Sequence, residues 1–177
     1  MKYLIVLIAL CWSALAHGAP SKTAIPAALA PIIDQAQSAL QDDKPKIALE
    51  VLESWSGDAH ALVELLRGHA LFQKKSFQEA EQAYKKAHEL DREMKSAAIG
   101  IARVRVETKD YAEAAKVLGG VLDTSTCDQN ELKLYAHVAY ENKDPRLATL
   151  LVQRGITRFP NDQALRKLDL ALLIEDG

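Results

Sequence analysis

The chain of 177 residues has little of what identifies enzymes, metalloproteins and nucleic-acid-binding proteins. It contains two cysteines, and it has no glycine-rich phosphate loop, no paired-cysteine metal spacing and no HExxH zinc motif. The formal net charge is −2, without a basic stripe, which argues against a nucleic-acid partner. We therefore expect a protein that is not an enzyme, with no catalytic residue, metal site, cofactor or small-molecule substrate.

The few nucleophilic and metal-ligating side chains are also badly placed for chemistry. His60 and His69 are nine residues apart, which does not put them on one face of a helix. Cys127 has no recognisable histidine partner nearby in the sequence. We expect it to be an inert, partly buried thiol between two helices, with an intermolecular disulfide as the alternative.

The N-terminus has the features of a secretory leader. Lys2 precedes an almost unbroken apolar run, and Ala14 and Ala16 provide small residues near a cleavage point. The run is short for a membrane span of about 20 residues. The sequence predicts a signal peptide over residues 1–18, a proline-containing linker over 19–30 and a folded domain over 31–177. The predicted location is the periplasm, and an uncleaved membrane anchor is the alternative. Leu10 before Cys11 argues against a lipoprotein.

Small residues recur along the chain at a nearly constant spacing. One column of alanines has steps of 32, 34 and 34 residues, and a second column of small residues lies twelve positions upstream. A repeat of this length predicts stacked helix pairs whose helices cross closely at the small side chains. The two columns are Ala48, Ala80, Ala114 and Ala148, and Ala36, Gly68, Ala102 and Ala136.

Amphipathic spacing around these columns predicts four helix–turn–helix units. Polar turns of three residues separate the two helices of each unit, which makes the helices antiparallel. The predicted pairs are 31–41 with 45–54, 59–73 with 77–90, 94–107 with 111–122, and 129–141 with 145–158. A ninth helix over 162–174, opened by Asp162, is expected to cap the last pair through Leu165, Leu168, Leu172 and Leu173. Leu170 and Ile174 are expected to pack as well or to form an edge for self-association.

The pattern resembles the tetratricopeptide repeat. The second unit matches best, the third and fourth match in part, and the first is the most degraded. Departures from the family pattern are the charged Glu64 and Arg67 at usually apolar places. The resemblance implies an all-α fold, a right-handed α-solenoid of about four repeats with a C-terminal capping helix. The matching residues of the second unit are Gly68, Leu71, Phe77, Ala80, Tyr84 and Ala87.

The resemblance also implies that the first helix of each unit lines a concave groove that binds a peptide or helix of another protein. Phe72 and Tyr140 are candidate aromatic anchors, Arg103 is a candidate partner for an acidic group, and His69 and His137 could make binding pH-sensitive. The alternative is that the apolar members pack against the next unit and the polar ones are only solvated. The predicted groove residues are Leu65, His69, Phe72, Gln73, Ile99, Arg103, Val106, Glu107, Lys133, His137, Tyr140 and Glu141.

Together these features predict an exported adaptor that binds a protein of the cell envelope. One alternative is a structural component that self-associates through its terminal helix. Another is an accessory subunit of an envelope assembly or of a cell-wall enzyme complex. Some members of the family hold a partner's C-terminal carboxylate with a set of Lys, Asn and Arg residues in the groove. The matching places of this sequence do not carry that set, so recognition of a C-terminal carboxylate is not expected.

Overall fold

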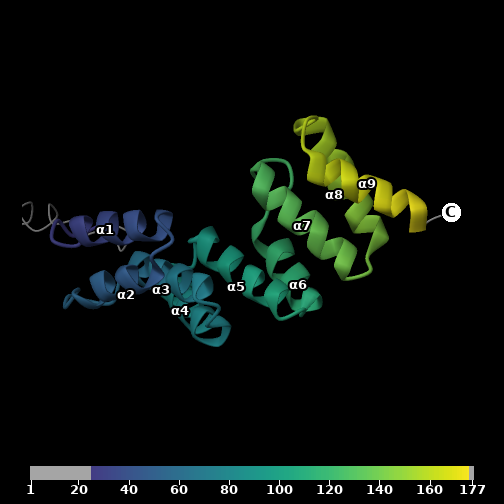
Figure 1. The fold of residues 1–177 in the computed structure, drawn as a ribbon. Helices are drawn as coiled ribbons and strands as arrows, with labels where there is room; N and C mark the ends of the chain where they lie inside the picture. Colours follow the sequence, from purple (N-terminus) through teal and green to yellow (C-terminus); the bar gives the residue numbers. More distant parts are fainter. Residues whose placement is uncertain (1–24, 176–177) are drawn as a thin grey trace, which may run out of the picture.

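The computed structural model describes residues 25–175, and these residues form nine α-helices and no strand (Figure 1). The predicted signal peptide over 1–18, Cys11 and the first part of the predicted linker lie outside the described residues. The all-α prediction is confirmed. The helices are α1 (Ala30–Gln41), α2 (Pro45–Glu53), α3 (Ala61–Gln73), α4 (Phe77–Leu90), α5 (Lys95–Glu107), α6 (Tyr111–Val121), α7 (Gln129–Glu141), α8 (Pro145–Arg158) and α9 (Gln163–Glu175).

The helix boundaries follow local chemistry. The predicted bounds of α4, α7 and α8 agree with the structure. The third helix begins at Ala61 and not at Ala59, because the side chain of His60 caps it by accepting a hydrogen bond from the Leu62 N–H at 3.2 Å. Asp128 and Glu131 form a capping box that starts α7.

The turn inside each helix pair has the same backbone geometry. Its middle residue adopts a positive φ of 55–62° in all four turns, although none of these residues is glycine. In each turn a backbone N–H bonds back to a carbonyl five residues earlier, such as Ser76 N–H to Leu71 O at 2.9 Å. This is the hydrogen-bond pattern of a Schellman turn, which stops one helix and reverses the chain within three residues. The positive-φ residues are Asp43, Lys75, Lys109 and Lys143.

The two columns of small residues lie at the tightest helix crossings, as predicted. All seven alanines are fully buried, and Gly68 is buried as well. Tyr84 of α4 shows why large side chains are excluded there. A Cβ on Gly68 would lie 2.5 Å from the Tyr84 ring, and a Cβ on Gly100 would lie 2.6 Å from it. The tyrosine ring therefore fits between α3 and α5 only because both facing positions are glycine.

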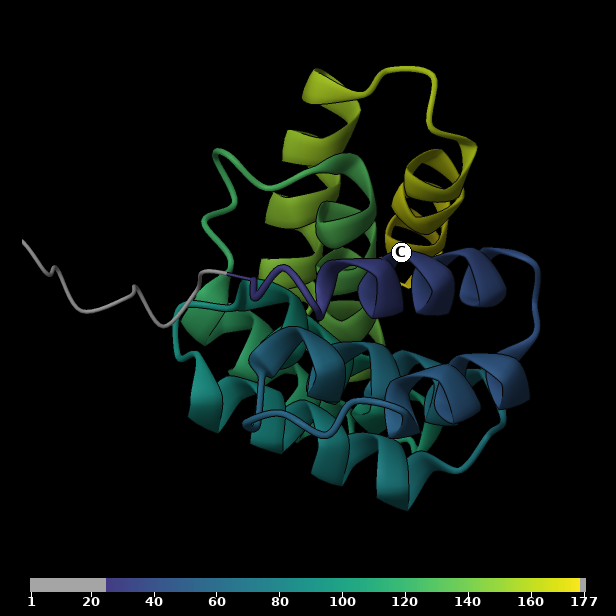
Figure 2. The same ribbon diagram turned by 90° about the vertical axis from the view of Figure 1, so that its left-hand side faces the viewer.

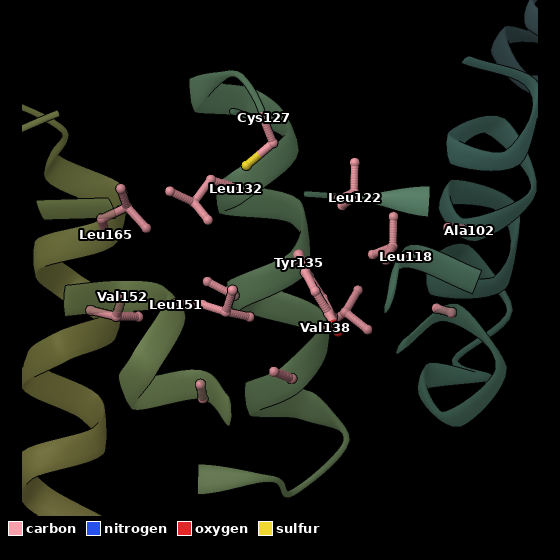
Figure 3. Close-up of a cluster of buried hydrophobic side chains, with 14 of the residues drawn as sticks. Ala102, Leu118, Leu122, Cys127, Leu132, Tyr135, Val138, Leu151, Val152 and Leu165 are labelled. Carbon is pink, nitrogen blue, oxygen red and sulfur yellow. The ribbon is translucent and has the colours of Figure 1, made fainter. Parts of the chain in front are cut away.

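Residues 122–128 form the junction between α6 and α7. Leu118, Leu122, Tyr135 and Val138 pack across it (Figure 3). Arg158 of α8 fixes the connection by donating to the carbonyl of Cys127 at 2.7 Å. Cys127 itself is buried and free.

The first helices of successive pairs lie side by side and form one face of the molecule. Helix α1 contacts α3, α3 contacts α5, and α7 contacts α9, while the Lys95–Glu131 ion pair of 2.9 Å joins α5 to α7. We call this surface the first-helix face. The stacking of the pairs behind one another is visible from the α1 end (Figure 2).

Helix α9 stacks on the fourth pair as predicted, but its apolar side chains divide differently between core and solvent. Leu165 and Leu172 are buried, and Leu168 is half-buried. Leu173 is 64% exposed, so its assignment to the packing stripe is wrong. Leu170 and Ile174 are 60% and 78% exposed, which excludes their packing within the described chain.

Candidate protein-interaction groove

The first-helix face is hollowed in three places, and nine of the twelve predicted groove residues line these hollows. The N-terminal hollow encloses about 370 Å³ between α1, α3, α4 and α5. The central hollow encloses about 210 Å³ between α3, α5 and the start of α7. The C-terminal hollow encloses about 560 Å³ between α7 and α9.

Four predicted residues meet in the N-terminal hollow. His69, Phe72 and Gln73 of α3 face Arg103 of α5 there, beside Leu40, Gln41 and Tyr84. The side chain of Gln73 also donates to the Leu40 carbonyl at 3.1 Å, which ties α3 to α1. Phe72 makes an edge-to-face contact with Phe77 at 5.6 Å between ring centroids. It is therefore partly a packing residue and only partly groove surface.

Arg103 and His69 also line the central hollow, so they form the boundary between the two hollows. Burial lowers the pKa of His69, and the positive charge of Arg103 lowers it further. The imidazole makes an edge-to-face contact with Tyr84, with ring centroids 5.5 Å apart. His69 is thus neutral near pH 7, and the positive charge at this boundary comes from Arg103. The Arg103 side chain is exposed and has no ion-pair partner within residues 25–175.

The C-terminal hollow contains the other four predicted residues that the structure brings together. Its α7 wall includes Lys133, His137, Tyr140 and Glu141. The opposite wall of the hollow is formed by five residues at the start and middle of α9, namely Ala164, Leu165, Lys167, Leu168 and Ala171.

Asp162 determines how α9 sits against α7. Its carboxylate caps α9 by accepting from the backbone N–H groups of Ala164 and Leu165 at 2.9 and 3.1 Å. It also accepts from the side chain of Gln129 at 2.5 Å and lies 3.3 Å from the Lys133 ammonium. The hydrogen bond from Gln129 is the largest cause that lowers the pKa of Asp162 to about 2. Asp162 is therefore an anion at any physiological pH.

The remaining predicted groove residues have other surroundings. Leu65 is buried in the core around Tyr84. Ile99 is 9% exposed and belongs to the core of the C-terminal half, although it lines the central hollow. Val106 packs partly buried against the same core. Glu107 is exposed at the end of α5.

Sequence reasoning missed the α9 wall of the C-terminal hollow. The signal was available, because Lys167 and Ala171 follow Lys133 and His137 at the repeat spacing of 34 residues. From the sequence we expect only a capping role for α9, so the predicted groove residues end at α7. In the structure α9 takes the place of the first helix of a fifth repeat.

The described residues contain neither a cluster of metal-ligating side chains nor a helix that could span a membrane. Across residues 25–175, no group of three or more His, Cys, Asp and Glu side chains is arranged to hold a metal ion. No helix in this range has the length and apolarity needed to cross a membrane.

Comparison with known proteins identifies the repeats. Residues 71–126 match the family model described as the tetratricopeptide repeat. No curated protein matches the chain. This match and the stacked helix pairs agree, so residues 71–126 match the tetratricopeptide repeat family and the described chain has the fold expected of such repeats.

Solved structures share the same right-handed solenoid fold. MamA from Desulfovibrio magneticus RS-1 is 19% identical, with a TM-score of 0.69, and the match covers 84% of this chain and 87% of that one. MamA from AMB-1 is 15% identical, with a TM-score of 0.71, covering 84% and 88%. The Cut9–Hcn1 hetero-tetramer of the APC/C contains a chain that is 22% identical, with a TM-score of 0.71, covering 81% of this chain and 29% of that one. At these identities the likeness shows the fold alone.

Proposed function

We propose that this protein is a non-enzymatic scaffold that binds a segment of a partner protein on its first-helix face. The tetratricopeptide repeat fold supports a role in protein–protein interaction. The observation that carries the proposal is the position of Arg103. Its exposed guanidinium has no ion-pair partner in the described part of the chain, and it stands between two hollows, of which the N-terminal one also contains Phe72 and Gln73.

An exported location completes the proposal. The basic start, apolar run and small residues of positions 1–18 support passage across an inner membrane into the periplasm. The partner is then a protein of the cell envelope. A fusion of residues 1–18 to alkaline phosphatase, which is active only after export, tests this part. An inactive fusion would remove the periplasmic location and leave the binding proposal intact.

The binding proposal is tested by reversing one exposed charge. Arg103→Glu is expected to lower the recovery of the partner in affinity capture from the native cells, because it replaces the groove cation by an anion. The matched control is Arg146→Glu on α8. Arg146 is also exposed and without an ion-pair partner in the described residues, and it lies on a second helix. Identical partners and yields for wild type and Arg103→Glu would refute groove binding.

A second candidate is self-association through α9. It is favoured by the three large apolar side chains that α9 exposes, namely Leu170, Leu173 and Ile174. Light scattering over a range of concentrations tests it. A monomer at every concentration would exclude it, whereas a dimer that dissociates in Leu170→Asp would establish it.

A further inference from the structure

We propose that the C-terminal hollow, between α7 and α9, is a separate binding site for a large apolar side chain that has an acidic residue on one side of it in an extended segment of the partner. This inference rests on the proposed function, because it assigns a ligand chemistry to one part of the same face. It differs from the Arg103 region in its walls, its volume and its charge.

The floor of the hollow is apolar, and its side chains do not bury one another completely. Leu134 of α7 and Leu168 of α9 are only half-buried, with Ala171 beside them. The hollow measures about 560 Å³, which lies within the range of about 300–1,000 Å³ typical of ligand pockets. The small side chain of Ala171 leaves room at the place where the equivalent residue of α7 is His137. A bulky apolar side chain would remove these walls from water.

The rim at one end of the hollow is positive. Lys133 and Lys167 hold the same place in successive first helices and both line the hollow. Lys133 lies beside Asp162, but the carboxylate of Asp162 is already shared with Gln129 and the start of α9. Lys167 is exposed and has no ion-pair partner among the described residues. An incoming carboxylate therefore meets an available ammonium at this end.

The charge of the rim changes along the hollow and gives the ligand a direction. Glu141 lies eight residues after Lys133 on α7, about 12 Å further along the helix axis. A segment with an acidic residue on one side of the apolar residue therefore fits in one orientation, with its carboxylate at the lysines and away from Glu141. An extended segment suits this shape, because the hollow continues the line of the first-helix face beyond α5. A fatty acid has the same pairing of apolar and anionic groups, and the test includes it.

Binding is measured with the full chain and fluorescein-labelled, end-capped decapeptides by fluorescence anisotropy. One set has a central Trp, Phe or Leu with Asp on one side of it, a second has Lys in place of Asp, and a third has a central Ala beside the same Asp. The Asp-flanked aromatic peptides are expected to bind at least tenfold more tightly than the other two sets. Equal binding of the three sets would overturn the inference. It would also be overturned if oleate displaced the peptides and the protein bound the three peptide sets without preference.

Two variants locate the site. Lys167→Glu is expected to weaken the Asp-flanked peptides about tenfold, and Ala171→Trp is expected to fill the hollow and abolish their binding. The control is Lys46→Glu on α2, which makes the same charge change at an exposed residue of a second helix. Circular dichroism confirms that each variant is folded. Unchanged affinity in Lys167→Glu would refute the assignment.

The failure of this inference can be told from the failure of the proposed function. If Arg103→Glu reduces capture of the native partner while Lys167→Glu alters neither capture nor peptide binding, the first-helix face is the binding surface and the C-terminal hollow is not the site. If neither variant changes capture of the native partner, groove binding itself is wrong.

Discussion

Replacement of Gly100 by alanine should destabilise the protein, although alanine is the better helix former. Gly100 lies inside α5, where alanine gains about 1 kcal/mol in helix propensity. The added Cβ would lie 2.6 Å from two ring carbons of Tyr84, well inside the 3.4–4 Å of ordinary van der Waals contact. Tyr84 is 1% exposed and cannot retreat, because its other side already contacts Gly68.

The magnitude follows from these opposing effects. Adding atoms to a well-packed site costs about 1–3 kcal/mol, and a ring held from both sides belongs at the upper end of that range. After subtraction of the helix-propensity gain, we expect Gly100→Ala to lower the free energy of unfolding by about 2 kcal/mol. This corresponds to a fall in Tm of about 4–8 °C for a chain of this size.

Gly120 provides a matched control with the opposite sign. It lies near the end of α6, and a Cβ there would meet nothing within 4 Å. Gly120→Ala should therefore raise stability by about 0.5 kcal/mol, less than the full propensity because of its place near the helix end. Urea unfolding followed by circular dichroism at 222 nm measures both variants. A Gly100→Ala variant as stable as the wild type would refute the argument that close crossings around Tyr84 hold the repeats together.

Three further predictions concern packing, capping and protonation. Ala114→Leu introduces a large side chain at a fully buried helix crossing and should cost about 3 kcal/mol, measured by urea unfolding. An unchanged midpoint would contradict the role of the small columns. Asp128→Ala removes the side chain that accepts from the backbone N–H of Glu131 at 2.9 Å, and should cost about 1–2 kcal/mol in the same assay; a loss below experimental error would show that α7 does not need its cap. His69→Gln concerns pH. Because the pKa of His69 is lowered in the folded protein, the unfolded chain binds protons more readily, so wild-type stability should fall as pH drops below about 6.5. The variant should lose less stability than the wild type between pH 7.5 and 5, and equal losses would show that His69 does not contribute.

The helical architecture could be predicted because it depends on local and periodic features. Small side chains every 34 residues, three-residue polar turns, and prolines at the first turn of α2 and α8 each act through backbone geometry or steric fit. Such effects are visible in the sequence. The burial of Glu64 is not visible in the sequence, because the side chains that pair with its carboxylate come from two helices. Its carboxylate pairs with Arg67 at 2.9 Å and with Lys86 of α4 at 2.6 Å.

The candidate site was predictable only where it repeats the family pattern. His69, Phe72, Gln73 and Arg103 meet because equivalent places on successive first helices face the same side. The alternative that Leu65 is a packing residue agrees with its burial, but no feature of the sequence distinguishes it from Phe72, which is only half-buried and lines the N-terminal hollow. Exposure at those places depends on how far the next helix pair reaches, which is a property of the assembled stack.

Asp162 connects the stability of the fold to the charge of the C-terminal hollow. The carboxylate that starts α9 also holds Lys133 and Gln129, so the docking of α9 and the partial neutralisation of Lys133 have one cause. Because the pKa of Asp162 is about 2, neither effect varies over the pH range in which the protein is expected to work. The rim charge that remains available is then that of Lys167. A substitution at Lys133 would change the fold and the rim together, whereas one at Lys167 changes the rim alone and is the informative variant.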